Sequence, residues 1–590
     1  MKLTLVQTLK KLLSLLTLEE FKSAAWLMIM MLLTALLDTI GIASIVPFIA
    51  VLANPDVIQT NSILNTMFQI FIIFGVKNNQ QFLFTLGVLV FILLITSLFL
   101  RALTTYRQHK FTHMNEYSIS KRLVEGYLRQ PYSWFLNNHS ADLGKTILSE
   151  VEKIIGGGIK PMMELISRAT TTIALLALLF FTDPKLTIIV ALSLGVTYGL
   201  IFFIVHKYLK TIGKERLKKN QLRFMAISEA FGAVKEIKFG NLEETYVKRF
   251  SEPAKIMAHN QLWAVTIASI PRFILEAVAF GGILLTILYL MHQTGNFNDA
   301  LPIITLYVFA GYRLIPALQA IYSSLTSLTF VGPSLDKLTQ DIKNFKPFNK
   351  NQDQNVVSFN KRVILKNVYY NYPNTSQSAL KDISLNIPEK TIVGLIGSTG
   401  SGKTTMVDII LGLLEAQKGT LEVDGQIITK HNSRSWQRSI GYVPQHIYLT
   451  DENISANIAF GISPKDINQE DVEKASKIAN LHDFVINELP EQYQTTIGER
   501  GVRLSGGQRQ RIGIARALYH SPKLLILDEA TSALDNTTEQ AVMDAINNLR
   551  KDITIILIAH RLNTVKNCDI IVKLEKGRIV EQGTFDKIIN

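Results

Sequence analysis

The chain has 590 residues, a formal net charge of +13 and a mean hydropathy of +0.21. This length is too great for one compact core, so we expect several domains. A positive mean hydropathy is unusual for a water-soluble protein, and many lysines and arginines crowd two loops between apolar segments. The pattern argues against a nucleic-acid partner and favours a membrane. The single cysteine, Cys568, excludes an intrachain disulfide.

Apolar segments dominate the N-terminal half. The first 22 residues mix charges with leucines at helical spacing, and we interpret them as an interfacial amphipathic helix rather than a cleavable signal peptide. The shorter apolar stretch 61–76 predicts an interfacial or re-entrant helix. Asp183-Pro184-Lys185 predicts a tight hairpin turn between two spans. Six stretches reach or nearly reach the length needed to cross a bilayer: about 24–51, 82–105, 162–182, 185–206, 264–291 and 299–323.

The loops between these stretches differ in charge. Loops 106–160 and 207–262 are rich in lysine and arginine, whereas the connections 52–81 and 292–298 contain one lysine between them. Basic residues accumulate on the cytoplasmic side of membrane proteins. We therefore expect the N-terminus, both basic loops and the C-terminal part to be cytoplasmic.

The composition changes near residue 358, from long apolar runs to short β-branched strands and helices. A polar segment rich in asparagine and glutamine precedes the change. We predict a transmembrane domain over 1–334 with six helices and cytoplasmic helical extensions, a linker over 335–358, and a soluble domain over 359–590.

A glycine-rich loop lies between a predicted strand and a predicted helix of the soluble domain. It reads GSTGSGKT and fits the pattern G-x-x-x-x-G-K-[ST]. Its glycines let backbone N–H groups close around phosphates at the positive end of the next helix. Lys403 should reach the β- and γ-phosphates and Thr404 should ligate Mg²⁺, so we expect ATP and Mg²⁺ as cofactors. The nucleotide-binding candidates here are Gly397, Ser398, Thr399, Gly400, Ser401, Gly402, Lys403, Thr404 and Thr405.

An acidic motif follows the loop by about 125 residues. Leu524–Glu529 reads LLILDE, an apolar strand that ends in two acids. Strand ends often carry solvated acids, so the motif becomes strong only beside the glycine-rich loop. We predict that Asp528 holds Mg²⁺ through water and that Glu529 polarises the attacking water as general base.

The segment 504–508 reads LSGGQ, and with this signature the chain resembles the ATP-binding-cassette (ABC) transporters. The resemblance implies that Tyr372 stacks on adenine. It also implies that Gln445 contacts the metal and takes part in catalysis, and that His560 is the catalytic switch histidine. The segments 496–501 (TIGERG) and 532–535 (SALD) match further family motifs.

The same resemblance implies a dimer and a fold. In this family each ATP is sandwiched between the P-loop of one cassette and the signature of another, and this chain has one cassette. A homodimer is the simplest arrangement, with backbone N–H groups of the signature capping the γ-phosphate. We expect a six-helix all-α transmembrane domain of exporter type followed by an α/β P-loop NTPase domain. The signature residues in question are Ser505, Gly506, Gly507 and Gln508.

Ionisable residues inside apolar spans are candidates for function. Asp38 lies in the first span, and Arg272 and Glu276 are one turn apart in the fifth and can pair with each other. Arg101, Arg272 and Arg313 lie on three spans and could line a site for phosphate or pyrophosphate. The alternative is that each forms an ion pair between packed helices or lies outside the lipid.

A closer resemblance concerns the cargo. The segments LLDTIGIASIVPFIAVLA, FLRALTTY, SIPRFILEAVAFGG and YRLIPALQAIYSSL are similar to spans of bacterial lipid-linked oligosaccharide flippases of the PglK type. This implies an external interfacial helix at 61–76, and a role for Arg101, Arg272 and Arg313 in handling the lipid pyrophosphate. Ala320 stands where that family has a further arginine, so the set is incomplete or the cargo differs.

The sequence thus predicts ATP-driven export or flipping of a lipid-linked oligosaccharide, or a similar anionic amphipathic lipid, across the bacterial inner membrane. The alternative within the family is an exporter of drugs, other lipids or peptides. A regulatory P-loop protein that uses ATP as a switch is disfavoured by the intact Glu529 and His560, and a soluble DNA-repair-type cassette would lack spans. We expect the segments 130–138 and 231–241 to dock on the cassettes.

Overall fold

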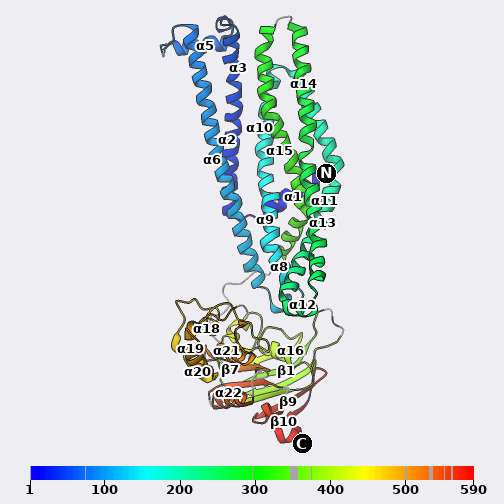
Figure 1. Ribbon diagram of the computed structural model, residues 1–590, viewed down its shortest axis with the longest axis vertical. Coiled ribbons are helices and arrows are strands. Elements are labelled where there is room, and N and C mark those ends of the chain that lie inside the picture. The colour runs from blue at the N-terminus through cyan, green and yellow to red at the C-terminus, as the bar shows by residue number, and fades with distance from the viewer. Residues whose placement is uncertain are drawn as a thin grey trace. The chain divides into compact units, whose positions relative to one another are not determined.

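The computed structural model describes residues 2–73, 75–294, 297–345, 357–373, 375, 377–498, 501–530, 536–549, 552–559 and 562–589. The chain divides into two compact units (Figure 1). The first comprises Met1–Gln130 and Asn137–Lys346, and the second comprises Pro131–Leu136 together with Pro347–Asn590.

The described part of the first unit is helical. Two of its long helices begin where the sequence supplies a cap: Asn78 Oδ1 accepts from Gln81 N at 2.9 Å, and Asp183 Oδ1 accepts from Lys185 N at 3.0 Å. The elements are α1 (Lys2–Ser14), α2 (Leu18–Ala43), α3 (Ile45–Ala53), α4 (Val57–Thr60), α5 (Ser62–Ile73), α6 (Asn79–Leu128), α8 (Ser140–Lys145), η1 (Thr146–Glu150), α9 (Val151–Ile154), η2 (Ile155–Ile159), α10 (Lys160–Thr182), α11 (Pro184–Gly232), α12 (Val234–Gly240), α13 (Glu243–Ser269), α14 (Pro271–Thr294) and α15 (Phe297–Asn344).

Among the described residues, five helices are long and apolar enough to cross a membrane: Leu18–Leu52, Asn79–Leu128, Ser140–Thr182, Pro184–Gly232 and Tyr307–Asn344. They coincide with five of the six predicted spans. The remaining one, 264–291, is divided between α13 and α14 at Pro271, which has no N–H to continue the helical ladder. The helix α5 confirms the prediction of a short apolar helix at 61–76.

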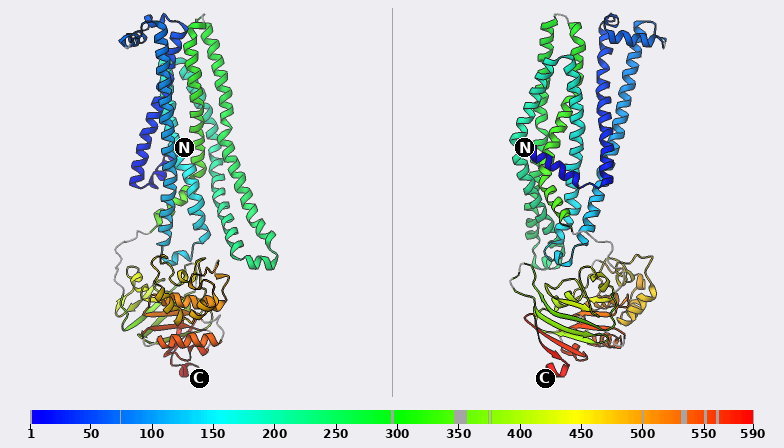
Figure 2. Two further views of the ribbon diagram at one scale, coloured as in Figure 1. Left: turned by 60° about the vertical axis from the view of Figure 1, so that its left-hand side comes forward. Right: turned by 180° about the vertical axis from the view of Figure 1, so that it is seen from behind.

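The long helices form two groups that separate toward the end where α5 lies (Figure 2). In one group α2 packs against α6, and in the other α10, α11 and α15 pack against one another. Leu12 of α1 is fully buried, and α1 packs on α15. The helix α15 runs on to Asn344, although we expected the linker to begin at residue 335.

A buried polar network joins these helices beyond the apolar stretches. Glu150 of η1 forms an ion pair with Arg216 of α11, and both are 2% exposed. Arg216 also donates to Ser334 Oγ of α15 at 2.9 Å, and Asn220 Nδ2 donates to Glu150 Oε1 at 2.7 Å. The additional partners matter because a buried ion pair is stable only when its remaining hydrogen-bonding capacity is satisfied.

The second unit is an α/β domain with two sheets. Its strands are β1 (Arg362–Tyr370), β2 (Leu380–Pro388), β3 (Ile392–Ile396), β4 (Lys418–Val423), β5 (Gln426–Ile427), β6 (Ile440–Val443), β7 (Leu524–Asp528), β8 (Thr554–Ile558), β9 (Ile570–Glu575) and β10 (Arg578–Gly583). One sheet has the order β2-β1-β4-β5, and the other has the order β10-β9-β3-β8-β7-β6. The pairs from β9 through β6 are parallel, which brings the carboxyl ends of β3 and β7 to one edge.

Burial on both faces explains the unbroken apolar runs of these parallel strands. In β8, Ile555 and Leu557 point into one core while Ile556 and Ile558 point into the other. The helices of this unit are α7 (Tyr132–Phe135), α16 (Lys403–Ile410), α17 (Ser433–Gln437), α18 (Ile454–Ile458), α19 (Gln469–Ile478), α20 (His482–Glu488), η3 (Gln492–Gln494), α21 (Gly506–Leu518), α22 (Asn536–Asn548), η6 (Leu562–Val565) and α23 (Phe585–Ile589).

The close contact between α11 and α15 predicts that a substitution at Gly213 destabilises the protein. A Cβ added at Gly213 would lie 2.3 Å from Phe330 O, so Gly213→Ala must push the two backbones apart. We expect a loss of about 1–3 kcal/mol in unfolding free energy, measured by thermal unfolding of the purified protein in detergent. The control is Gly195→Ala on the same helix, where a Cβ meets nothing within 4 Å. Equal melting temperatures for the two variants would contradict the close contact.

Candidate functional site

The glycine-rich loop connects β3 to α16, as predicted. Gly397 and Gly402 have φ values of 148° and 105°, which are unfavourable for residues with a Cβ. A Cβ at Gly397 would lie 2.3 Å from Leu574 O, and one at Gly402 would lie 2.8 Å from Ala379 O. Glycine is therefore required at both positions by conformation and by space.

Lys403 lies at the first turn of α16, with its ammonium folded back over the loop. Its Nζ donates to Gly397 O at 2.8 Å and to Ser398 O at 3.1 Å. Burial lowers the pKa of Lys403, while the nearby carboxylates of Glu529 and Asp528 raise it. The loop carbonyls thus hold a cation where it can meet a phosphate.

Two hydroxyl groups test whether a nucleotide polyphosphate fits this loop. Ser401 is 2% exposed, and its Oγ has no hydrogen-bond partner among the described residues. Buried polar atoms are normally paired, and a ligand oxygen can supply the missing partner. Thr404 is exposed on the next helix, in the position that a P-loop uses for Mg²⁺. The residues present fit ATP and its metal.

The predicted acids lie at the end of a buried strand. Asp528 ends β7 and is 5% exposed. Glu529, the next residue, has a φ of 50°, in the left-handed region that non-glycine residues rarely adopt. Gln445 Nε2 donates to Glu529 Oε2 at 2.8 Å. The structure therefore brings together three of the predicted residues, which come from segments more than 80 positions apart.

Tyr372 also lies beside the P-loop helix. Its hydroxyl is 3.1 Å from Thr405 Oγ1, and its ring makes an edge-on contact with Tyr370, with 5.2 Å between centroids. The side chain is only partly buried, so one side of the ring is open. This position suits the predicted stacking on adenine.

The signature segment forms the start of α21. Ser505 is its N-cap and makes a capping box with Gln508: Ser505 N donates to Gln508 Oε1 at 2.8 Å, and Gln508 N donates to Ser505 Oγ at 3.2 Å. The cap fixes the first turn, whose N–H groups point away from the helix. The described residues do not include His560, the segment 532–535, Glu499 or Arg500.

Asp408 was not among the predicted site residues, although an acid within an apolar helical run was a signal for it. It lies on α16 and is 8% exposed. Burial, with a smaller effect of Asp528, raises the pKa of Asp408 to about 6. Tyr132 of α7 lies in the same unit, and its pKa is raised by burial and by the Asp408 carboxyl.

The membrane unit holds a cluster of charges on four helices. Arg313 of α15 lies 3.8 Å from Asp38 of α2, and Ser97 of α6 donates a short hydrogen bond to the same carboxylate. Arg168 of α10 interacts electrostatically with Asp38, Arg313 and Arg101. The sequence analysis overlooked Arg168, although it is an ionisable residue inside the predicted span 162–182.

Arg272 differs from the other predicted arginines. Its Nε donates to Glu276 Oε1 at 2.8 Å, the pairing expected from their spacing, and its side chain is 62% exposed. No described contact joins it to Arg101 or Arg313. The structure therefore gathers Arg101 and Arg313 around Arg168, while it places Arg272 in a local ion pair.

Comparisons with known proteins agree with this architecture. Residues 380–532 match the family described as ABC transporter, and residues 59–312 match the ABC transporter transmembrane region. The chain is 30% identical over 476 residues to an ATP-dependent lipid A-core flippase of Cupriavidus metallidurans, covering 79% of this chain and 78% of that protein. It is 30% identical over 513 residues to the heterocyst differentiation ATP-binding protein HepA of Nostoc, covering 84% and 81%.

A solved structure of a bacterial Atm1-family ABC exporter with ATP bound has the same fold, with a TM-score of 0.76, 20% identity and coverage of 94% and 95%. The chain belongs to the ABC transporter family and is an exporter half-transporter. It is an integral membrane protein whose ATPase is coupled to transport, and half-transporters of this kind function as dimers. The predicted family is confirmed, as is the fold class of a helical membrane domain followed by a P-loop NTPase domain, whereas the count of six spanning helices stays a prediction.

The position of Glu529 predicts the effect of removing its carboxylate. Glu529→Gln keeps the size of the side chain but removes the base, so ATP hydrolysis should fall by about 10²–10⁴-fold while ATP binding is retained. Turnover and nucleotide affinity of the purified protein measure the two effects. The control is Glu575→Gln on β9, an exposed acid that should leave hydrolysis unchanged. Undiminished hydrolysis by Glu529→Gln would exclude Glu529 as the base.

The raised pKa of Asp408 predicts that the stability of the protein depends on pH. Its folded pKa of about 6 lies above the ordinary 3.8, so ionisation destabilises the native state. The penalty is absent at low pH, grows as the pH rises from about 4 to 6, and is fully present above pH 6. Asp408→Asn removes this penalty and should stabilise the cassette at pH 8 by up to about 3 kcal/mol.

Thermal unfolding of the full-length protein at pH 8 and pH 5 measures this difference. The gain from Asp408→Asn should shrink at pH 5, where the native carboxyl is largely protonated. The control is Asp552→Asn, which changes an exposed acid and should have little effect at either pH. A gain of equal size at both pH values would contradict the raised pKa.

Proposed function

We propose that this exporter flips an amphipathic lipid that carries phosphate or pyrophosphate, with a lipid-linked oligosaccharide as the best candidate. The observation that carries the proposal is the cluster of Arg101, Arg168 and Arg313 around Asp38. Isolated charges within a membrane span are strongly disfavoured, so a cluster of three cations supports a role in binding an anionic partner.

The charges of the cluster do not cancel. Its acids are Asp38 and Glu164, against three arginines. Asp38 is 8% exposed and already accepts from Ser97 while lying near Arg313. The excess positive charge favours an anionic group with several acceptor oxygens, and guanidinium groups bind phosphate oxygens in pairs. The resemblance to PglK-type flippases left the set of arginines incomplete at Ala320. Arg168 adds an arginine to the cluster from another helix.

Arg272 remains part of the proposed site. Its guanidinium is paired with Glu276, so it can contribute to the cargo only when that pair opens. Opening the pair would leave two charges without their partner inside a predicted span, which is costly. We therefore expect Arg272 to matter less than the three clustered arginines.

One of the relatives supports a lipid cargo, whereas another, 30% identical over 488 residues, is a putative multidrug export protein of Bacillus subtilis. The chain aligns over most of its length with an ATP-dependent lipid A-core flippase, which by its name moves an amphipathic lipid. We propose the bacterial inner membrane as the location, with the N-terminus and the cassette on the cytoplasmic side, because the basic loops lie at that end of the spans.

We also propose a homodimer with two equivalent ATP sites. The P-loop of one copy and the signature turn of its partner, including Ser505 and Gly507, would together enclose each nucleotide. Thr404, Gln445 and Asp528 would hold Mg²⁺, which neutralises phosphate charge when bound. Glu529 would polarise water, and His560 would contact the γ-phosphate. The segments proposed to dock on the cassettes are 130–138, which contains α7, and 231–241, which contains α12.

The arginine cluster predicts selective transport defects. Arg168→Gln, Arg101→Gln and Arg313→Gln should each reduce flipping of a pyrophosphate-linked lipid by about tenfold or more, because each removes a charge-assisted contact. Lipid-free ATPase activity should change much less. Flipping of labelled lipid-linked oligosaccharide in proteoliposomes measures the effect.

The matched control is Lys207→Gln, which removes a cation from α11 outside the cluster and should leave flipping unchanged. A panel of labelled lipids and drugs distinguishes the cargoes. If all three arginine variants flip the pyrophosphate lipid normally, or if only uncharged drugs are moved, the proposed cargo is wrong.

A further inference from the structure

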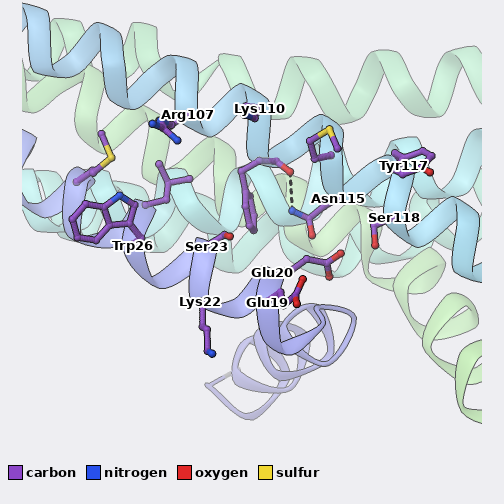
Figure 3. Close-up of a pocket in the computed structure, with 14 residues that line it drawn as sticks. Glu19, Glu20, Lys22, Ser23, Trp26, Arg107, Lys110, Asn115, Tyr117 and Ser118 are labelled. Carbon is purple, nitrogen blue, oxygen red and sulfur yellow. Dashed lines mark hydrogen bonds between the residues drawn. The ribbon is translucent and has the colours of Figure 1, made fainter.

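A groove separate from the arginine cluster lies between α2 and α6. It has a volume of about 700 Å³ and is lined by side chains of both helices (Figure 3). The apolar stretch 24–51 begins beside it, and the stretch 82–105 ends beside it. The groove therefore starts at the level where both helices leave the hydrocarbon core, at the end that carries the basic loops.

Two unpaired cations lie on the α6 side of this groove. Arg107 and Lys110 are three residues apart, so they share one face of the helix. Both are exposed, and neither has an ion-pair or hydrogen-bond partner among the residues that the structure describes. Lys22 also contributes to the lining but points away from these two in Figure 3. The groove thus presents two free positive charges near the membrane surface.

On the α2 side the lining is charged at Glu19, Glu20 and Lys22 and apolar at Trp26, Leu27 and Met30. Trp26 is 63% exposed, and Leu27 and Met30 lie beside it along the same helix. Exposed tryptophan is typical of the head-group level of a bilayer, where its ring contacts chains and its N–H reaches polar groups. A ligand here must combine an apolar part with an anionic part.

Asn115 adds a polar group that lacks a partner. It is 2% exposed, and its Nδ2 donates to Phe111 O at 2.7 Å, the bond drawn in Figure 3. Its Oδ1 has no hydrogen-bond partner among the described residues, although Asn115 lines the groove. A buried carbonyl oxygen without a donor is destabilising, so a hydroxyl of a ligand would be favoured there.

We propose that the groove binds a phospholipid of the cytoplasmic leaflet with an anionic head group that bears hydroxyls, for which phosphatidylglycerol is the probe. The phosphate lies on Arg107 and Lys110, and the chains lie along Trp26, the exposed apolar side chain of the lining. A head-group hydroxyl donates to Asn115 Oδ1. This lipid is a bound partner of the membrane domain rather than the cargo, and the site does not depend on the proposed cargo.

The acidic residues at the far end of the groove do not offset its preference for an anionic head group. Glu20 is already occupied, since its Oε2 accepts from Thr17 N at 2.7 Å and lies 3.8 Å from Arg122. Glu19 remains as the one uncommitted carboxylate among the described lining residues, against two free cations. A choline head group has no donor for Asn115, and an ethanolamine head group adds a positive charge next to Arg107 and Lys110.

Lipid titration of the purified full-length dimer, followed by native mass spectrometry, tests the proposal. Phosphatidylglycerol should bind about tenfold more tightly than phosphatidylcholine or phosphatidylethanolamine of the same chain length, given two surface charges near the phosphate. Glycerol 3-phosphate, which lacks chains, should not compete at the same concentration. The double variant Arg107→Gln/Lys110→Gln should lose about tenfold in affinity for phosphatidylglycerol, and Asn115→Leu should also weaken it.

The matched control is Lys214→Gln/Lys218→Gln, which removes two exposed cations from α11 and should leave lipid binding unchanged. Should Asn115→Leu fail to fold, the double charge variant, which changes only exposed side chains, still decides the question. Unchanged affinity of that variant, equal binding of the zwitterionic lipids, or full competition by glycerol 3-phosphate would each overturn the proposal. Cargo transport is measured separately, so failure of the proposed cargo leaves these results unaffected.

Discussion

Charged and polar groups that leave bulk water must find partners, and this constraint shapes both units of the chain. Beyond the apolar stretches of the membrane unit, Glu150 and Arg216 are buried together and share Ser334 and Asn220 as further partners. Around Asp38 the pairing is incomplete, because three arginines face two acids. The same requirement thus produces a closed network around Glu150 and leaves an excess of positive charge around Asp38.

The same constraint on buried polar groups applies to the cassette. The P-loop turns Lys403 onto the carbonyls of Gly397 and Ser398, and it leaves Ser401 Oγ buried without a described partner. Burial makes each of these groups respond strongly to a phosphate, since electrostatic interactions are larger away from water. The strained backbone of Glu529 and its contact with Gln445 place the acid beside the phosphate site before any ligand arrives.

The two membrane sites differ in depth and in the ligand they suit. The arginine cluster joins α2 and α6 to α10 and α15, so binding there engages both helix groups. Among the described residues, the groove at Trp26 and Arg107 is lined by α2 and α6 alone, and we propose that it lies at the membrane surface. A lipid in the groove would bind one helix pair of the domain, whereas cargo in the cluster would connect the two groups that separate toward the α5 end (Figure 2).

The sequence alone was sufficient for features that depend on local pattern. Apolar length predicts spans, the glycine spacing predicts the loop between β3 and α16, and the LLILDE run predicts β7, because each is determined by neighbouring residues. The LSGGQ signature likewise identified the family. The break at Pro271 shows the limit of this reasoning, since apolar length does not reveal where a helix is interrupted.

Only the tertiary structure decided which distant side chains meet. It paired Gln445 with Glu529 and gathered Arg168 with Arg313 and Asp38. It also buried Asp408 and left Asn115 Oδ1 without a donor among the described residues. The physical reason is that burial and pairing depend on packing between segments far apart in the chain, and local sequence patterns do not determine that packing.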